Sequence, residues 1–457
     1  MEHAIAAYRQ PVKRLFIQTF GCQMNEYDSL RVRRMLGTMG YETTPRLDRA
    51  TVIFLNTCSV RDKAEQKVYS FLGRLRALKA QRPQLKIIVA GCMAQQLGTA
   101  LLSRFPHLDL VLGTRAIGAL PELLEGVQAD HQRLAHLPDT DQEGWQQLFQ
   151  GADQWISGVS APLTIMQGCN NFCTYCIVPH VRGRERSRPS AEIVREIQLL
   201  TAAGAKEVVL LGQNVNSYGQ GLDESIDFPG LLRLIERTTD IRRVRFTTSH
   251  PKDLTADLMR CLAELKTLCR HIHLPFQAGS DRILKKMNRH YTVADYLDKV
   301  DRLRRACPEI ALTADVMVGF PGEREDDFEG TLQLIDTVRF DNLFSFRYSD
   351  RPFARAVQFP DKVDEALKAE RLVRLQALQA SITLAKNQEE IGRLREILVE
   401  GESRAAEGQL SGRTSHNRIV NLVGPRQIIG RLETVKIVAA YMHSLKGERI
   451  RNSEALS

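Results

Sequence analysis

Three cysteines stand close together near the middle of the chain. Cys169, Cys173 and Cys176 lie in the run MQGCNNFCTYCIVP, with the spacing C-x3-C-x2-C. Iron–sulfur clusters are usually held by four thiolates, so three leave one iron open to bind a small molecule and pass it an electron. Zinc is the alternative, because it requires four ligands and the nearby His180 can supply the last one. The spacing favours a cluster.

A second set of cysteines is spread over the first part of the chain. Cys22, Cys58 and Cys92 each follow an apolar stretch that predicts a β-strand, at 13–20, 51–55 and 85–90, and predicted helices at 24–39 and 63–80 separate these strands. Alternating strands and helices predict a parallel sheet, whose carboxyl ends meet at one edge. We therefore expect these cysteines to converge there and to hold a second cluster. The alternative is three unrelated buried thiols beside packed strands.

The middle of the chain repeats the strand–helix alternation six times. Candidate strands lie at 163–167, 207–211, 243–247, 271–275, 312–318 and 342–347. This pattern predicts a partial (βα)6 barrel with its site at the carboxyl-end loops. Gln213, Ser249 and Gln277 lie in those loops and are candidate cofactor-binding residues. Each of them suits loop capping equally well.

Two basic segments are candidates for binding nucleic acid. After the central cysteines, arginines occupy alternate positions, which suits an extended segment with one basic face that binds phosphates or pairs with local carboxylates. Residues 411–457 contain eight Arg or Lys and three Asp or Glu, among short strands that predict a small β-barrel. Such a charge favours a nucleic-acid backbone. The candidate RNA-binding residues are Arg182, Arg184, Arg186, Arg188, Arg413 and Arg418.

Length and composition limit the class of protein. The 457 residues predict about three domains, at 1–130, 155–390 and 391–457. The net charge of +9 favours an anionic partner. No apolar run is long enough to cross a membrane, and the first residues lack a signal-peptide pattern. Nine cysteines are too few for a disulfide scaffold in a chain of this length, so we expect a cytoplasmic protein with no membrane partner.

Several runs resemble the methylthiotransferases, which belong to the radical S-adenosylmethionine (SAM) enzymes. The similar runs are TFGCQMNEYDS at 19–29, NTCSVR at 56–61, GCMA at 91–94, the central cysteine run, HLPFQAGSD at 273–281 and VGFPGE at 318–323. The tail, with GRTSHNR at 412–418, resembles the RNA-binding TRAM domain. One run departs from the family, which commonly has Arg-Pro-Gly-Thr-Pro where this chain has Arg351-Pro352-Phe353-Ala354-Arg355.

The resemblance implies a fold and an activity. It implies an α/β protein with a flavodoxin-like parallel domain, a partial radical SAM barrel and a TRAM β-barrel. The runs QMN at 23–25 and CSVRDKAEQK at 58–67 are most similar to the branch that adds a methylthio group to carbon 2 of N6-isopentenyladenosine beside the anticodon of tRNA. A sister methylthiotransferase, acting on another tRNA base or a ribosomal protein, is one alternative. A zinc-stabilised RNA-binding protein without catalysis is the other.

The resemblance also implies cofactors and partners. Two 4Fe–4S clusters are implied, with SAM as cosubstrate and an electron donor such as flavodoxin or ferredoxin. Cys169, Cys173 and Cys176 would hold the cluster that cleaves SAM to start the radical reaction. The cluster on Cys22, Cys58 and Cys92 would hold or sacrifice the sulfur that is added. The tRNA would present its anticodon stem-loop with the isopentenylated adenosine.

Overall fold

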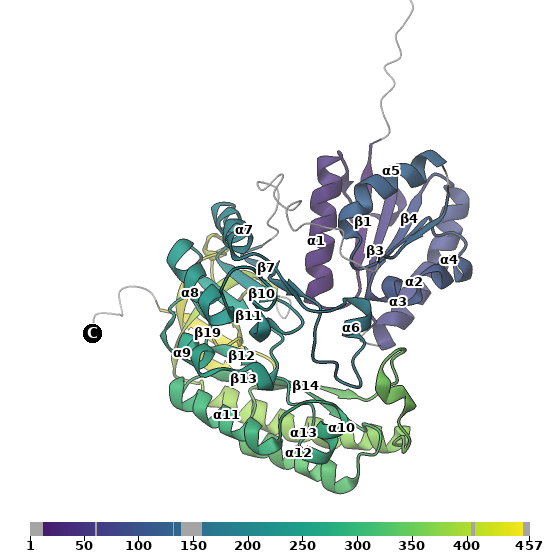
Figure 1. Ribbon diagram of the computed structural model, residues 1–457. Coiled ribbons are helices and arrows are strands. Elements are labelled where there is room, and N and C mark those ends of the chain that lie inside the picture. The colour runs from purple at the N-terminus through teal and green to yellow at the C-terminus, as the bar shows by residue number, and fades with distance from the viewer. Residues whose placement is uncertain (1–11, 60–61, 131, 139–157, 404–406, 451–457) are drawn as a thin grey trace, which may run out of the picture. The chain divides into compact units, whose positions relative to one another are not determined.

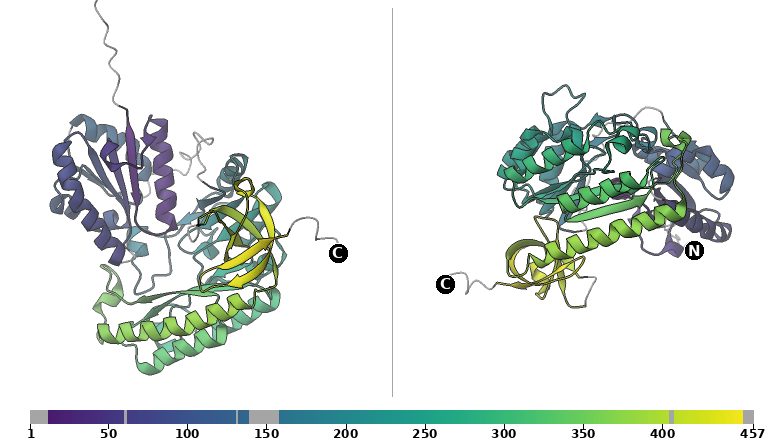
Figure 2. Two further views of the ribbon diagram at one scale, coloured as in Figure 1. Left: turned by 180° about the vertical axis from the view of Figure 1, so that it is seen from behind. Right: turned by 90° about the horizontal axis from the view of Figure 1, so that it is seen from below.

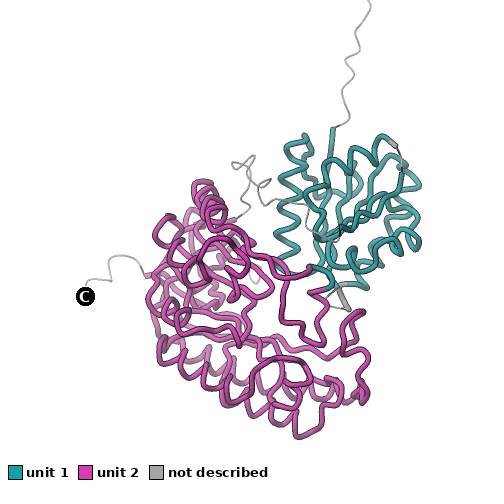
Figure 3. The backbone as a smooth tube through the Cα atoms, in the orientation of Figure 1, with its two compact units in different colours: residues 1–154, 180–182 teal, residues 155–179, 183–457 magenta. Residues whose placement is uncertain are grey.

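The computed structural model describes residues 12–59, 62–130, 132–138, 158–403 and 407–450. The chain forms two compact units, one of residues 1–154 with 180–182, the other of residues 155–179 with 183–457 (Figure 3). Most of the stretch between the first two predicted domains lies outside the described residues. Within the described ranges, every helix is too short or too polar to cross a membrane.

The first unit is a parallel α/β fold (Figure 1). Its six strands run in the order β2-β1-β3-β4-β5-β6, and every neighbouring pair is parallel. The order contains the 2-1-3-4-5 arrangement of flavodoxin-like sheets, which confirms that prediction. The strands are β1 (Arg14–Thr19), β2 (Glu42–Thr43), β3 (Val52–Thr57), β4 (Lys86–Gly91), β5 (Leu110–Leu112) and β6 (Leu134–His136). The main helices are α1 (Gln23–Thr38), α2 (Asp62–Gln81), α3 (Cys92–Leu97), α4 (Thr99–Arg104) and α5 (Leu120–Asp130).

Helices cover both faces of this sheet, so its central strands are apolar on both sides. Every residue of β3 and β4 is buried. Val52 and Phe54 pack with residues of α1 and α5, whereas Ile53 and Leu55 point to the opposite face and pack with α2, α3 and α4. This double burial fixes the strand register, because a slip by one residue would exchange the two faces.

The second unit contains the partial barrel. Its strands are β7 (Ser160–Thr164), β10 (Glu207–Leu211), β11 (Arg243–Phe246), β12 (His271–His273), β13 (Ala311–Val318) and β14 (Asn342–Arg347). Helices α7 (Ser190–Ala202), α8 (Phe228–Thr238), α9 (Ala256–Glu264), α10 (Asp281–Lys286), α11 (Val293–Ala306) and α12 (Glu325–Val338) alternate with them. All six predicted strands are present. They form two parallel three-stranded sheets, joined by a bridge between Val244 and Leu268, because the chain bends before β12.

A closed five-stranded barrel completes the second unit. Its order is β15-β16-β17-β19-β18, and its core is a small apolar cluster that includes Val399, Val420 and Ile437. Helix α13 (Glu365–Gln388) lies along α12 and reaches this barrel, as Figure 2 shows. The strands are β15 (Leu394–Glu402), β16 (Leu410–Thr414), β17 (Ile419–Leu422), β18 (Leu432–Ala440) and β19 (Leu445–Arg449).

Candidate metal centres

The three cysteines of the first unit follow three adjacent strands. Cys22 caps α1 directly after β1, Cys58 follows β3, and Cys92 begins α3 directly after β4. The strand order reverses between β1 and β3, and open α/β sheets bind their ligands at such a crevice. The structure thus brings the three thiols to the sheet edge that the sequence predicted.

Glycines allow the cysteine loops to approach each other closely. A Cβ added at Gly21 would lie 2.7 Å from Cβ of Cys58, and one added at Gly91 would lie 2.4 Å from the carbonyl oxygen of Thr57. Both glycines also have positive φ, +146° and +93°. A side chain at either position would force the strand ends apart, since the close approach is to backbone or to a rigid Cβ.

Two buried asparagines tie the loops together. The side-chain amide of Asn25 donates to Oδ1 of Asn56 at 2.8 Å and to the carbonyl of Thr57 at 2.9 Å. Asn56 donates back to the carbonyl of Asn25 at 2.8 Å. Asn25 also accepts a hydrogen bond from Sγ of Cys22 at 3.3 Å. The first and second cysteine loops are therefore fixed by one polar network.

The thiols of this trio have different proton affinities. A hydrogen bond from Cys58, together with the charge of Arg182, lowers the pKa of Cys22 to about 6. Burial raises the pKa of Cys92, and Arg182 acts against that rise. One member of the trio is thus readily deprotonated, and the trio lies beside a buried positive charge.

That positive charge comes from a distant part of the sequence. Nη2 of Arg182 lies 2.9 Å from Oδ2 of Asp28, and both side chains are buried. The hydroxyl of Thr114 donates to the carbonyl of Val181, which fixes the same segment to the first unit. Nη1 of Arg182 and Oδ1 of Asp28 have no hydrogen-bond partner among the described residues. Arg182, predicted to contact RNA, is here an internal residue of the first unit, next to its cysteines.

The second trio lies on a loop that is closed by a short pair of strands. β8 (Met166–Gln167) pairs antiparallel with β9 (Arg186–Ser187), and the amide of Cys169 donates to the carbonyl of Gly183 at 3.2 Å. Gly168 has φ +75°, and an added Cβ would lie 2.0 Å from the carbonyl oxygen of Arg184. The two ends of the loop can meet only because this residue is glycine.

Each sulfur of the second trio accepts one N–H hydrogen bond, at 3.4 Å in every case. The donors are the side-chain amide of Asn171 to Cys169, Nη1 of Arg289 to Cys173, and the backbone amide of Val178 to Cys176. Burial raises the pKa of Cys169, and it raises the pKa of Cys176 to about 12. Free thiols at Cys169 and Cys176 would remain protonated, and the N–H donors suit sulfurs that are deprotonated by a bound metal.

Arg289 is buried, and within the described part of the chain none of its hydrogen-bond partners is a carboxylate. Besides Cys173, its guanidinium donates to the carbonyl of Pro275 at 2.9 Å, to the hydroxyl of Tyr291 at 3.1 Å and to that of Tyr175 at 3.4 Å. Buried charges are normally paired with an opposite charge. Of the partners of this arginine, Cys173 is the one that becomes a thiolate when it binds a metal.

The segment after α10 holds the cysteine loop in place. Thr174 donates its backbone amide to the carbonyl of Met287 at 3.1 Å and its hydroxyl to that of Lys286 at 2.9 Å. Asn288 donates to the carbonyls of Asn171 and Phe172. Sequence reasoning missed residues 286–291, because no motif connects them with cysteines more than a hundred positions away.

The donor sets of both trios fit an iron–sulfur cube with one free iron. In the described part of the chain, no group of three or more His, Cys, Asp and Glu side chains is arranged to hold a single metal ion. A cube takes one thiolate for each iron, so its thiolates lie further apart than ligands that share one zinc ion. The three N–H donors and the buried positive charge of Arg289 are the features that match a cluster in the barrel.

The predicted cofactor-binding residues lie in three loops of the barrel. Oε1 of Gln213 accepts a hydrogen bond from the amide of Gly168 at 2.5 Å, so this residue positions the cysteine loop. Ser249 is buried, and its hydroxyl has no partner among the described residues. Gln277 is buried with φ +67° and forms a bridge with Val316 through its backbone.

Further buried polar atoms of the same loops also lack partners in the described ranges. His250 is buried, and its Nδ1 accepts from the amide of Lys252 at 3.2 Å. Burial and the charge of Arg289 lower the pKa of His250 well below its usual range, so the imidazole is neutral. His250 was not among the cofactor-binding residues predicted from the sequence, because only tertiary contacts bury it beside Tyr291. The unpartnered atoms are Oδ1 of Asn214, Nδ2 and Oδ1 of Asn216, Oγ of Ser249 and Nε2 of His250. Such a set fits a ligand with several polar groups, as SAM has.

The predicted basic face after the central cysteines is divided. α6 (Val178–Val181) is helical, and the extended part is limited to β9. Arg184 and Arg186 are exposed, whereas Arg182 and Arg188 are buried. Nη1 of Arg188 lies 2.5 Å from a carboxylate oxygen of the buried Glu196. The expectation that all four arginines face RNA therefore needs correction, since carboxylates from other elements bind two of them.

The two arginines predicted to bind RNA in the terminal barrel also have carboxylate partners. Nε of Arg413 lies 3.0 Å from Glu400, and Nη2 of Arg418 lies 2.7 Å from Asp341. The second pair connects the terminal barrel to the segment before β14. The sequence could not reveal this pair, because its members are far apart along the chain.

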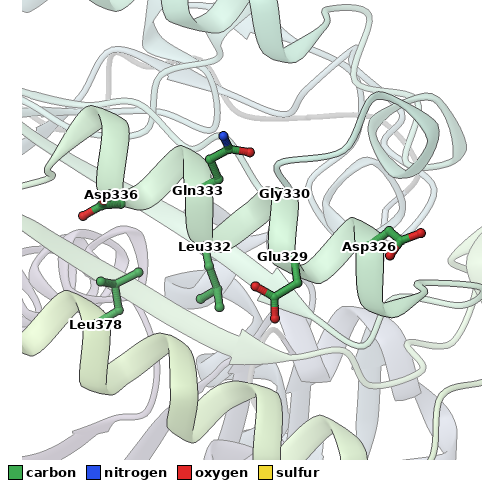
Figure 4. A pocket seen from close by; sticks show the side chains of 7 residues that line it. All are labelled: Asp326, Glu329, Gly330, Leu332, Gln333, Asp336 and Leu378. Atoms are coloured by element: carbon green, nitrogen blue, oxygen red, sulfur yellow. The ribbon is translucent and has the colours of Figure 1, made fainter.

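A surface hollow of about 570 Å³ lies between α12 and α13, away from the strand ends. Figure 4 shows that its carboxylates, Asp326, Glu329 and Asp336, come from α12, whereas Leu378 comes from α13. Cysteines and unpartnered polar atoms are absent from its lining within the described residues. The candidate centres are therefore the two cysteine sites.

Comparison with known proteins identifies the family. Residues 14–113 match an uncharacterized protein family (UPF0004), residues 163–335 the radical SAM superfamily, and residues 388–450 the TRAM domain. A tRNA-2-methylthio-N(6)-dimethylallyladenosine synthase from Syntrophobacter fumaroxidans is 62% identical over 434 residues, or 95% of each chain. The chain belongs to this synthase family. A synthase of the same name from Syntrophus aciditrophicus is 50% identical over 441 residues, covering 96% of this chain and 95% of the relative.

Several solved structures resemble this chain in fold. The radical SAM methyltransferase TsrM from Kitasatospora setae matches with a TM-score of 0.54 at 14% identity, covering 88% of this chain and 81% of its own. The radical SAM enzyme OxsB matches with a TM-score of 0.53 at 12% identity, covering 82% of this chain and 58% of its own. The family matches and these neighbours confirm the predicted fold class, and the matches to the synthases confirm the methylthiotransferase resemblance.

Proposed function

We propose that the chain is a radical SAM methylthiotransferase that adds a methylthio group to carbon 2 of N6-isopentenyladenosine beside the anticodon of tRNA. The identity of 62% along nearly the whole chain to a synthase named for this product carries the proposal. Carbon 2 of adenine has no acidic proton and no leaving group, so acid–base catalysis cannot open its C–H bond easily. Radical chemistry can, and it is a task given to SAM with iron–sulfur cofactors.

Cys169, Cys173 and Cys176 would hold the cube that binds SAM. When bound, the cube and SAM supply the radical that removes the hydrogen from carbon 2. Asn171, Val178 and Arg289 each direct one N–H at a cysteine sulfur, which orients the thiolates and offsets their negative charge. The polar groups of SAM would bind among Gln213, Ser249 and Gln277 and the unpartnered atoms of Asn214, Asn216 and His250.

Cys22, Cys58 and Cys92 would hold the second cube and the sulfur that is added. These cysteines lie at the switch point of a flavodoxin-like sheet, where such sheets bind ligands, so a cube held there would supply its sulfur at that crevice. Arg182 and Asp28 lie behind the thiols as a buried ion pair, which offers the site a positive charge without a net buried charge. The family membership favours this enzyme over a non-catalytic zinc protein.

The RNA would contact the terminal barrel, which matches the TRAM domain, and the exposed arginines Arg184 and Arg186. The target base must leave its stack to reach the barrel, at a cost of a few kcal/mol in a duplex but less in a loop. An electron donor such as flavodoxin or ferredoxin would reduce the cube. The proposed substrate places the enzyme in the cytoplasm.

Single cysteine variants test the proposal. Cys173→Ala should abolish SAM cleavage, because one ligand of the barrel cube is lost. Cys58→Ala should leave SAM cleavage measurable but stop formation of the methylthio product. Cys307→Ala is the matched control, because this buried cysteine belongs to the apolar core of the barrel. Liquid chromatography with mass spectrometry measures 5′-deoxyadenosine and the modified nucleoside. A normal rate of product formation by Cys58→Ala would show that the first trio is not the sulfur source.

Nucleoside analysis separates the sister activities. In a deletion strain, tRNA should lose 2-methylthio-N6-isopentenyladenosine and accumulate N6-isopentenyladenosine, while other thiolated nucleosides remain. Loss of a methylthio group from another base, or from a ribosomal protein, would assign the chain to a sister branch.

A further inference from the structure

Two phenylalanine rings are exposed on loops that adjoin the barrel trio. The side chain of Phe172 is 44% exposed and that of Phe353 is 63% exposed. Phe172 precedes Cys173, and Phe353 lies in the loop after β14. The two loops are bonded to each other, because the amide of Ala356 donates to the carbonyl of Thr174 at 2.8 Å. The loops that carry the two rings therefore lie side by side next to the barrel trio.

Both residues have a left-handed backbone, which non-glycine residues rarely adopt. φ is +45° at Phe172 and +69° at Phe353. Phe353 stands where the methylthiotransferases commonly have glycine. A residue without a side chain can therefore occupy this position in the loop. Backbone strain of this kind is concentrated at functional sites.

Arginines accompany both rings. The guanidinium of Arg184 lies 5.4 Å from the centroid of the Phe172 ring, and Arg184 is itself exposed. Arg355 is exposed two residues after Phe353. Exposed aromatic faces beside arginines are the features with which proteins bind unpaired nucleotides, through stacking on the bases and charge on the phosphates.

We propose that Phe172, Arg184, Phe353 and Arg355 form a surface that binds unpaired RNA nucleotides next to the modified base. The proposal rests on the proposed function, which brings an anticodon loop to this barrel. Phe353 and Phe172 stack on bases, and Arg184 and Arg355 pair with phosphates. The surface holds the loop open after the target base has left its stack, so it acts in positioning the substrate and not in the chemical step.

Binding measurements test this surface directly. A fluorescent anticodon stem-loop without the isopentenyl group is titrated with cluster-loaded protein, without reductant or SAM, and anisotropy is recorded. Phe353→Ala should weaken binding about 5- to 160-fold, the range of one lost base stack. Phe353→Tyr should restore most of the affinity, because the aromatic face is kept. Val373→Ala, which shortens a side chain that is 66% exposed on α13, should leave the affinity unchanged.

Glycine at the same position separates stacking from folding. Phe353→Gly should lose as much affinity as Phe353→Ala, yet its resistance to urea should equal or exceed that of the wild type, since glycine readily adopts φ +69°. Arg184→Gln should lower the slope of log affinity against log salt by about one, as for one lost phosphate contact.

Three results would overturn the proposal. They are unchanged affinity in Phe353→Ala, failure of Phe353→Tyr to restore binding, and a loss seen only with isopentenylated RNA, which would assign the ring to the isopentenyl group. Failure of the proposed function can be distinguished from failure of this RNA-binding surface. In that case wild-type protein makes no methylthio product although the affinity still responds to Phe353. SAM cleavage without RNA should be equal in wild type and Phe353→Ala.

Discussion

The two cysteine sites differ in how they treat negative charge. In the barrel, all three sulfurs accept N–H hydrogen bonds, and the buried Arg289 has no carboxylate among its hydrogen-bond partners. In the first unit, Sγ of Cys22 donates to Asn25, and the buried Arg182 is paired with Asp28. Among its described hydrogen-bond partners, the arginine of the barrel site thus has only a cysteine sulfur that can neutralise it as an anion, whereas the arginine of the first site is already neutralised by a carboxylate.

This difference matches the two proposed roles. A cube that is reduced in every turnover benefits from a fixed positive charge and from N–H donors, which raise its reduction potential. A cube that holds or gives up sulfur changes its own charge during the reaction. Because Asp28 neutralises Arg182, the first site does not depend on a constant charge from the cluster. The comparison therefore predicts different responses when equivalent parts of the two sites are altered.

The largest effect should come from removing a whole trio. Anaerobically prepared wild type should contain about eight irons, and each triple Cys→Ala variant about four, because the two cubes bind independently. Iron and sulfide assays with electron paramagnetic resonance measure this. Only the variant of Cys169, Cys173 and Cys176 should lose the signal that responds to SAM. Equal iron in all three proteins would mean that the trios do not hold two cubes.

Breaking the buried ion pair of the first unit should have the next largest effect. Asp28→Asn leaves Arg182 without its counter-charge and should destabilise the metal-free first unit by about 3–5 kcal/mol. Hydrogen exchange of β3 and β4 in increasing urea measures the loss. The matched control is Asp48→Asn, which breaks an exposed pair with Arg46 in the same unit and should change nothing measurable. Equal stability of Asp28→Asn and wild type would refute a neutralising role for Asp28.

Changing the groups that donate hydrogen bonds to the barrel sulfurs should give the smallest effect. In a background without the first trio, Arg289→Met should shift the reduction potential of the remaining cube to more negative values, because a buried positive charge is lost. Asn171→Ala should produce a smaller shift, since a neutral donor makes a weaker hydrogen bond than a charged one. Spectroelectrochemical titration measures both. Identical shifts in the two variants would show that the charge of Arg289 does not determine the reduction potential of the cube.

Elements with strong periodicity were predicted closely from the sequence. The predicted strands at 207–211 and 342–347 coincide with β10 and β14, and the predicted helices at 24–39 and 63–80 agree with α1 and α2 to within one residue at each end. Very short strands were missed, such as β2, β5 and β6, because two or three residues carry no alternation. Strands β16 and β19 were missed for a related reason, since glycine interrupts their pattern.

The sequence by itself determined which cysteines form each trio, because spacing and strand–helix alternation place them on one loop or at one sheet edge. Only the tertiary structure decided what surrounds the sulfurs. Arg182 and Arg188 look like Arg184 and Arg186 in sequence, yet two are buried by carboxylates from other elements and two are exposed. Local patterns follow from neighbours along the chain, whereas the burial and pairing of a charge depend on residues that only folding brings together.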